Sequence, residues 1–131
     1  MVSSLIVFSQ CNITPSPEKS ASVIKNKELQ PRFFHNVYFY LKPNLTDEER
    51  NKFEHGLIEL GTIEELIDYH IGKPAMTPRE VVDNSYQYSI ITSFKDKSGH
   101  DAYQVHPIHE NFRNEIEGIV DSVRIYDSLI E

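Results

Sequence analysis

The segment from Arg32 to Lys42 restricts the fold more than any other part of the chain, because it is a strand pattern with apolar or aromatic side chains on both faces. Side chains alternate between the two faces of a strand. One face carries Phe33, His35, Val37, Phe39 and Leu41, and the other carries Phe34, Asn36, Tyr38 and Tyr40. A strand of this kind needs cover on both faces, so it is expected inside a layered structure.

The segment after this strand is predicted to be a helix from Thr46 to about Leu60. Thr46 and Glu49 match a capping box, in which the two side chains satisfy each other's backbone N–H groups at the start of a helix. Gly61 is a common type of residue at a helix end. The sequence therefore predicts a helix packed on the first strand.

Three further strands are predicted where apolar and polar residues alternate, over residues 66–71, 86–94 and 122–129. Residues 72–85 contain two prolines and few periodic apolar positions, so they are predicted to form a long loop.

The stretch between the last two strands is predicted to be helical and interrupted. Asp96 or Ser98 caps a short helix that ends near His106, and Pro107 occupies the first turn of a new helix. Apolar residues recur along one face of this new helix: Ile108, Phe112, Ile116 and Ile119.

With this stretch counted as one crossover, the order strand-helix-strand-strand-helix-strand predicts a ferredoxin-like α+β fold. This fold is a four-stranded antiparallel sheet with helices on one face. The aromatic face of the first strand then points away from the helices as a large apolar patch, and such patches usually mark an association surface. The same face of a second copy is the simplest cover, so a homodimer is expected.

The stretch from Tyr103 to His109 concentrates the groups with the most potential chemistry, one phenol and two imidazoles around Pro107. Histidine has the ordinary pKa nearest to neutral pH, and tyrosine can donate or accept a hydrogen bond. In the functional interpretation, His109 is a general base that removes a proton from carbon next to a carbonyl, and Tyr103 stabilises the oxygen. In the structural interpretation the same groups organise the helix break, with His106 as a cap.

A small apolar or aromatic ligand is expected between the sheet and the helices. The predicted lining residues, besides Tyr103 and His109, are His35, Val37, Phe39, Phe53, Leu57, His106 and Phe112. For His35 a purely structural place in the core is the alternative.

Charge and composition restrict the other function classes. The net charge is −7 and no run of Lys or Arg occurs, so nucleic-acid binding is not expected. Cys11 is the single cysteine, which excludes an internal disulfide. His106 and His109 are three residues apart, but no third ligand has supporting spacing, and no glycine-rich phosphate loop occurs. Neither a metal nor a cofactor is therefore expected.

The N-terminus is predicted to be a targeting segment. Residues 1–11 resemble a bacterial lipoprotein signal remnant that stops at Cys11, residues 12–31 form a polar linker, and the domain covers residues 32–131. Gln10 departs from the usual small residue, and no Lys or Arg precedes the apolar run. The expected location is the bacterial envelope, with a lipid anchor at Cys11. The alternative is a tail with a free thiol on a cytoplasmic protein.

These segments together resemble a known family. The most specific is Ala-Tyr-Gln-Val-His-Pro-Ile-His at 102–109, and weaker matches lie at residues 34–39, 72–74, 83–88 and 124–127. The chain resembles the stress-responsive A/B barrel (Dabb, dimeric α/β-barrel) family over about residues 33–128. The resemblance implies small dimers whose two sheets form a barrel. One plant member of this family is a cofactor-free polyketide cyclase. The resemblance to it implies that Tyr103 and His109 form a catalytic pair and that His35 is a pocket histidine.

Three hypotheses about function follow. The first is a stress-response-type barrel that binds a small apolar or aromatic molecule. The second is a cofactor-independent enzyme, polyketide-cyclase-like or an isomerase, which uses the His/Tyr pair for proton transfer. The third is a structural dimer without activity. A cavity of at least about 300 Å³ reached by Tyr103 and His109 would separate the first two from the third.

Overall fold

The computed structural model describes residues 30–131. The predicted signal remnant and nearly all of the predicted linker lie outside the described residues, so the lipid anchor at Cys11 and the exported location stay predictions. Within residues 30–131, no helix is both long enough and apolar enough to span a bilayer.

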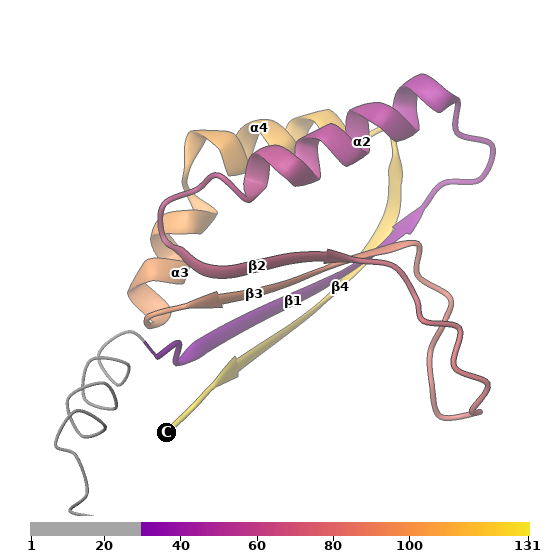
Figure 1. Cartoon of the computed structure of the whole chain (residues 1–131). Helices are drawn as coiled ribbons and strands as arrows, with labels where there is room; N and C mark the ends of the chain where they lie inside the picture. The colour runs from indigo at the N-terminus through magenta and orange to yellow at the C-terminus, as the bar shows by residue number, and fades with distance from the viewer. Residues whose placement is uncertain (1–29) are drawn as a thin grey trace, which may run out of the picture.

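The described residues form one antiparallel sheet with the strand order β2-β3-β1-β4. The strands are β1 (Phe33–Leu41), β2 (Leu66–Gly72), β3 (Tyr88–Phe94) and β4 (Val120–Leu129). The helices are α2 (Asp47–Leu60), α3 (Lys97–Gln104) and α4 (Pro107–Ile116). All three helices lie on the same side of the sheet (Figure 1). The predicted ferredoxin-like arrangement is thus confirmed.

The second crossover contains two helices, as the predicted interruption at Pro107 indicates. Asp96 caps α3, and its carboxylate accepts the backbone N–H of Gly99 at 3.0 Å. His106 caps α4, and its Nδ1 accepts the backbone N–H of Ile108 at 3.2 Å. Pro107 occupies the first position of α4, where the missing N–H costs nothing.

Several boundaries move by a few residues. Tyr88, not Tyr86, begins β3, and β4 begins at Val120 because Leu41 pairs with it across a register shift. The helix α4 ends at Ile116, so Ile119 of the predicted apolar stripe lies in the following turn, where it is still buried.

The predicted capping box at the start of α2 is present. The Thr46 hydroxyl accepts the Glu49 N–H at 3.1 Å, and the Glu49 carboxylate accepts the Thr46 N–H at 2.8 Å. Gly61 ends the helix, but with an ordinary φ of −66°. The reason for glycine here is packing, because a Cβ at this position would lie 2.8 Å from the ring of Tyr69.

The alternation predicted for β1 is confirmed. The face toward the helices is buried and belongs to the hydrophobic core, while the opposite face is half-buried. The buried side chains are Phe33, His35, Val37 and Phe39. The helix-facing side of β1 therefore forms the floor on which the helices pack.

The edge strand β4 is not fully covered by the helices. Val123 and Ile125 pair with Phe39 and Val37 in the register and therefore share their side of the sheet. Yet Val123 is 44 % exposed and Ile125 is 50 % exposed. The space between β4 and the helices is consequently open to solvent along this edge.

The helices α2 and α4 approach closely at Gly56, where a Cβ would lie 2.7 Å from the Phe112 ring. We expect overpacking in Gly56→Ala to cost about 1–3 kcal/mol of unfolding free energy. The helix-propensity gain of about 1 kcal/mol offsets part of this cost, so the net loss is up to about 2 kcal/mol. Urea denaturation measures the change. Gly118→Ala is the matched control, because nothing lies within 4 Å of the added methyl group. Equal free energies of unfolding for the two variants would show that α2 and α4 can move apart without a loss of stability.

Candidate functional site

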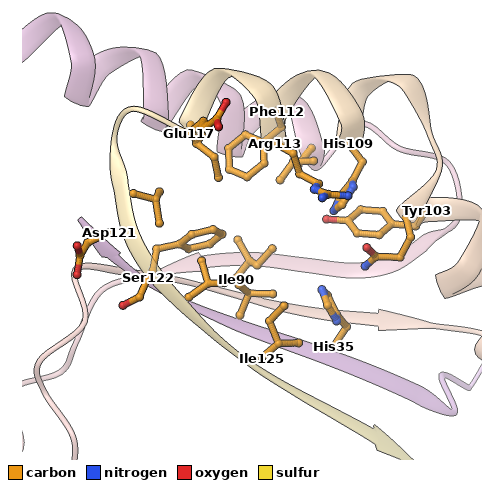
Figure 2. A pocket seen from close by; sticks show the side chains of 17 residues that line it. His35, Ile90, Tyr103, His109, Phe112, Arg113, Glu117, Asp121, Ser122 and Ile125 are labelled. Atoms are coloured by element: carbon orange, nitrogen blue, oxygen red, sulfur yellow. The ribbon is translucent and has the colours of Figure 1, made fainter. Parts of the chain in front are cut away.

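A half-open cavity of about 540 Å³ lies between the sheet and α4. Its volume falls within the roughly 300–1,000 Å³ typical of small-molecule sites. The apolar wall consists of Val37, Phe39, Leu60, Ile90, Phe112, Ile116, Val120, Val123 and Ile125. The polar lining residues are His35, Tyr103, Gln104, His109, Arg113, Glu117, Asp121 and Ser122. Figure 2 shows that His35, Tyr103, His109 and Arg113 gather at one end, away from Glu117, Asp121 and Ser122.

Tyr103 at the end of α3 and His109 at the start of α4 meet across the helix break. Their ring centroids are 4.7 Å apart, and the ring planes are inclined by 58°. Tyr103 is fully buried, and His109 is 8 % exposed. Both side chains point into the same end of the cavity, with the Tyr103 hydroxyl turned toward its interior (Figure 2).

One polar atom of each residue in this pair has no hydrogen-bond partner within the described residues. The Tyr103 hydroxyl oxygen and His109 Nδ1 are both buried and make no hydrogen bond. Buried polar atoms without a partner are rare in folded proteins and cost stability. Both atoms therefore remain free to bond a polar group of a ligand.

Desolvation keeps both groups neutral. Burial raises the pKa of Tyr103 above its ordinary value. Burial, and after it the nearby Arg113 guanidinium, lower the pKa of His109 to about 4, while the Gln104 carbonyl acts in the opposite direction. At neutral pH the site thus offers a phenol donor beside an uncharged imidazole.

His35 approaches the same end of the cavity from β1 (Figure 2). Its Nδ1 lies 2.6 Å from Oδ1 of Asp127, its neighbour in the β1–β4 register. Burial lowers the pKa of His35, although Asp127 acts against this shift. The neutral imidazole therefore donates from Nδ1 to the carboxylate, which leaves Nε2 as the acceptor.

The structure places most of the predicted site residues on the cavity wall. Those that line it are His35, Val37, Phe39, Tyr103, His109 and Phe112. Phe53 and Leu57 lie in the core behind the wall, and the Phe53 ring packs edge-on against Phe39 at 5.3 Å. His106 is outside the lining because its ring caps α4. These last three positions support the cavity without facing it.

The sequence-based prediction missed several residues that line the cavity. Arg113 follows His109 by four residues on α4, and this helical spacing could have identified it. Val123 and Ile125 on β4, and Ile90 on β3, face the cavity only because of the strand register. No local signal distinguishes such residues from ordinary strand residues.

Comparison with known proteins supports the fold. The chain matches the family model described as "Stress responsive A/B Barrel Domain" over residues 33–130. No protein of curated function matches significantly.

Several solved structures have the same fold at low sequence identity. A Dabb family protein with a ferredoxin-like fold from Mesorhizobium loti is 22% identical, with a TM-score of 0.62, and the match covers 78% of this chain and 99% of that one. A dimeric ferredoxin-like protein of unknown function from Thermobifida fusca is 19% identical, with a TM-score of 0.62 and coverage of 76% and 92%. The hydroxynitrile lyase from Passiflora edulis is 13% identical, with a TM-score of 0.63 and coverage of 78% and 96%.

The low pKa of His109 couples protonation to stability. The unfolded chain binds a proton near the ordinary pKa of 6.5, while the folded chain resists protonation until about pH 4. The stabilisation is therefore complete above about pH 6.5 and is lost as the pH falls through this window. We expect His109→Gln to reduce the loss of unfolding free energy between pH 7 and pH 5 by about 1–2 kcal/mol.

Urea denaturation at both pH values measures this loss. His55→Gln is the control, because His55 is exposed on α2, outside the cavity lining. A pH dependence in His109→Gln equal to that of the wild type would contradict the burial of a neutral imidazole.

Proposed function

This chain belongs to the stress-responsive A/B barrel family, and from that premise we propose that it binds a small apolar or aromatic carbonyl compound in the cavity beneath α4. The observation that carries the proposal is the pair of unpartnered polar atoms, the Tyr103 hydroxyl and His109 Nδ1, at one end of an otherwise apolar cavity. An apolar ligand with one oxygen satisfies both the wall and this polar end.

The contacts suggest how such a ligand lies. Its apolar body contacts Val37, Phe39 and Ile90 on the floor of the cavity. Its carbonyl oxygen accepts a hydrogen bond from the Tyr103 hydroxyl, which removes the cost of the unpaired donor. The Arg113 guanidinium at the same end favours an oxygen that carries partial negative charge. These features together select a polarised carbonyl group rather than a plain hydrocarbon.

A cofactor-independent enzyme is the second candidate, favoured by the contact between Tyr103 and His109. A proton on carbon next to the carbonyl passes to an unprotonated ring nitrogen of His109, and the C–H electron pair moves onto the carbonyl oxygen. Tyr103 then hydrogen-bonds the resulting enolate. A hydroxynitrile lyase from Passiflora edulis has the same fold, so the fold is compatible with small-molecule catalysis.

The low pKa of His109 supports the first candidate over the second. A general base works best when its pKa lies near the working pH. With a pKa of about 4, His109 is a weak base at neutral pH. Binding is therefore the better-supported function, and slow proton transfer is the secondary one.

We also propose that the chain acts as a homodimer that pairs through the side of the sheet opposite the helices. Tyr38 lies on that side, and its ring makes edge-on contacts with Tyr86 at 4.9 Å and Tyr126 at 6.0 Å. Ile91 is 36 % exposed and Tyr126 is 57 % exposed beside it. The Oδ1 atom of Asn36 on the same side is buried without a partner. A second copy would cover these rings and bring polar groups near Asn36.

The ligand hypothesis is tested with an aromatic ketone and the hydrocarbon of the same shape that has a methylene group in place of the carbonyl. We expect the ketone to bind more tightly than the hydrocarbon by calorimetry. Tyr103→Phe should weaken ketone binding about 3–10-fold, since it removes a hydrogen bond worth about 0.5–1.5 kcal/mol. Hydrocarbon binding should be unchanged in the variant.

Tyr86→Phe is the matched control, because Tyr86 lies outside the cavity lining. Equal ketone affinity in the wild type and Tyr103→Phe would exclude the proposed contact. The same samples in D₂O separate the two candidates: deuterium exchange at the carbon next to the carbonyl that is lost in His109→Ala indicates proton transfer, and no exchange indicates binding alone.

The dimer is tested by light scattering after gel filtration. We expect a mass of about twice the 15.2 kDa of one chain, and we expect Ile91→Glu to shift it toward one chain, because a buried charge disfavours the interface. Ile58→Glu is the control, because Ile58 is 62 % exposed on α2. A wild type that stays monomeric at micromolar concentration would contradict the dimer.

A further inference from the structure

Three side chains of metal-ligating type meet beside the polar end of the cavity, and none comes from the same element as another. His35 on β1, His100 on α3 and Asp127 on β4 each place one ligand atom within 4.8 Å of the others. Both histidines are buried, and the Asp127 side chain is 43 % exposed. Chain folding alone therefore brings together two imidazoles and one carboxylate.

We propose that this cluster binds a divalent transition-metal ion, with zinc as the first choice. Two imidazole nitrogens and one carboxylate oxygen form a common ligand set for catalytic zinc, and the same set with open positions suits ferrous iron. Magnesium and calcium prefer oxygen ligands, so the two histidines disfavour them. Three protein ligands leave at least one position for water or another small ligand.

The geometry requires only small side-chain movements. Ligand bonds of about 2.0–2.2 Å place the ligand atoms of one ion about 3–4 Å apart. His35 Nδ1 and Asp127 Oδ1 are 2.6 Å apart, so they must separate slightly. The widest gap, at most 4.8 Å, must close by about 1 Å. Asp127 is free to make most of this movement because its side chain is half exposed, and an ion can reach the cluster from the same side.

His100 is the member that the surrounding contacts leave unexplained. Its ring is held among aromatic rings, stacked on Phe33 at 4.5 Å and edge-on to Phe94 at 5.4 Å. Its Nε2 lies 3.1 Å from the side-chain nitrogen of Gln104, while its Nδ1, 3.6 Å from Oδ1 of Asp101, is buried without a hydrogen-bond partner. A buried neutral imidazole has one donor and one acceptor nitrogen, and both need a partner. Ligation of a metal ion by one nitrogen would give it the partner that the protein contacts do not supply.

The proton balance is simple. His35 now donates its Nδ1 proton to the Asp127 carboxylate. For Nδ1 to ligate a metal ion, its proton moves to Nε2, so the ring stays neutral and both residues become ligands. Zinc binding at neutral pH should therefore release no net proton from this pair.

The metal site goes beyond the proposed carbonyl-binding function and can be tested apart from it. His35 belongs to both sites, but His100 and Asp127 are absent from the cavity lining, while Tyr103 and His109 are absent from the cluster. Variants at one set should leave the function of the other intact. Failure of one proposal can thus be told from failure of the other.

The test uses the untagged full-length chain with Cys11→Ser, which removes the single thiol. After treatment with EDTA, the protein is titrated with zinc chloride by calorimetry, and the metal retained after gel filtration is counted by mass spectrometry. We expect one zinc ion per chain. Asp127→Asn and His100→Ala should each weaken binding by at least about 10–100-fold, on the scale known for disturbed metal sites.

His55→Ala is the matched control for surface histidines, since His55 is exposed on α2. Asp127→Asn keeps the shape of a half-exposed side chain, so it remains informative if His100→Ala does not fold. His109→Ala should retain full zinc affinity. Absence of zinc uptake, or equal zinc affinity in the Cys11→Ser protein and its Asp127→Asn variant, would overturn the proposal.

Discussion

The break between α3 and α4 is the constraint on which the candidate site depends. Pro107 cannot continue α3, because it lacks an N–H and its ring clashes with the preceding turn. His106 caps the new helix, which fixes the direction in which the chain leaves. In one continuous helix, Tyr103 and His109 would lie six residues and hence about 120° apart around the axis. The break instead brings their rings to 4.7 Å and turns both into one cavity.

The apolar wall determines what this pair can do. Desolvation disfavours the charged form of every ionisable group, so it keeps the Tyr103 phenol and the His109 imidazole neutral at the same pH. The neutral Tyr103 donor suits a polarised carbonyl oxygen, which accepts its hydrogen bond, better than a full charge. The same desolvation weakens His109 as a base, which places binding before catalysis. One physical effect thus accounts for both the ligand class and the modest reactivity.

Most of the fold could be predicted because its signals are local. The alternation in residues 33–41, the Thr46 capping box and the helix start at Pro107 each involve neighbouring residues. The predicted boundaries of the elements were less accurate where tertiary contacts determine them. The pairing of Leu41 with Val120 extends β4 by two residues beyond its alternating pattern.

The candidate site was predictable only in part. Tyr103 and His109 stand out in the sequence as a cluster around a proline. His100 looked isolated, because His35 and Asp127 lie on other elements. The β1–β4 register places Asp127 beside His35, and the packing of α3 on the sheet brings His100 to them. Phe53 has the helical spacing of a lining residue, but Phe39 stands between it and the cavity. Which of two stacked layers faces a cavity depends on packing, and spacing alone does not encode it.

The most direct test of this account is the titration of the His109 ring by NMR, with and without a bound aromatic ketone. Isotope-labelled ring nitrogens report the protonation state directly. We expect a neutral ring at pH 5, a midpoint near pH 4, and a change in ring shifts when the ketone binds. An ordinary midpoint near pH 6.5 together with no response to the ketone would contradict it, because His109 would then face solvent rather than a sheltered cavity.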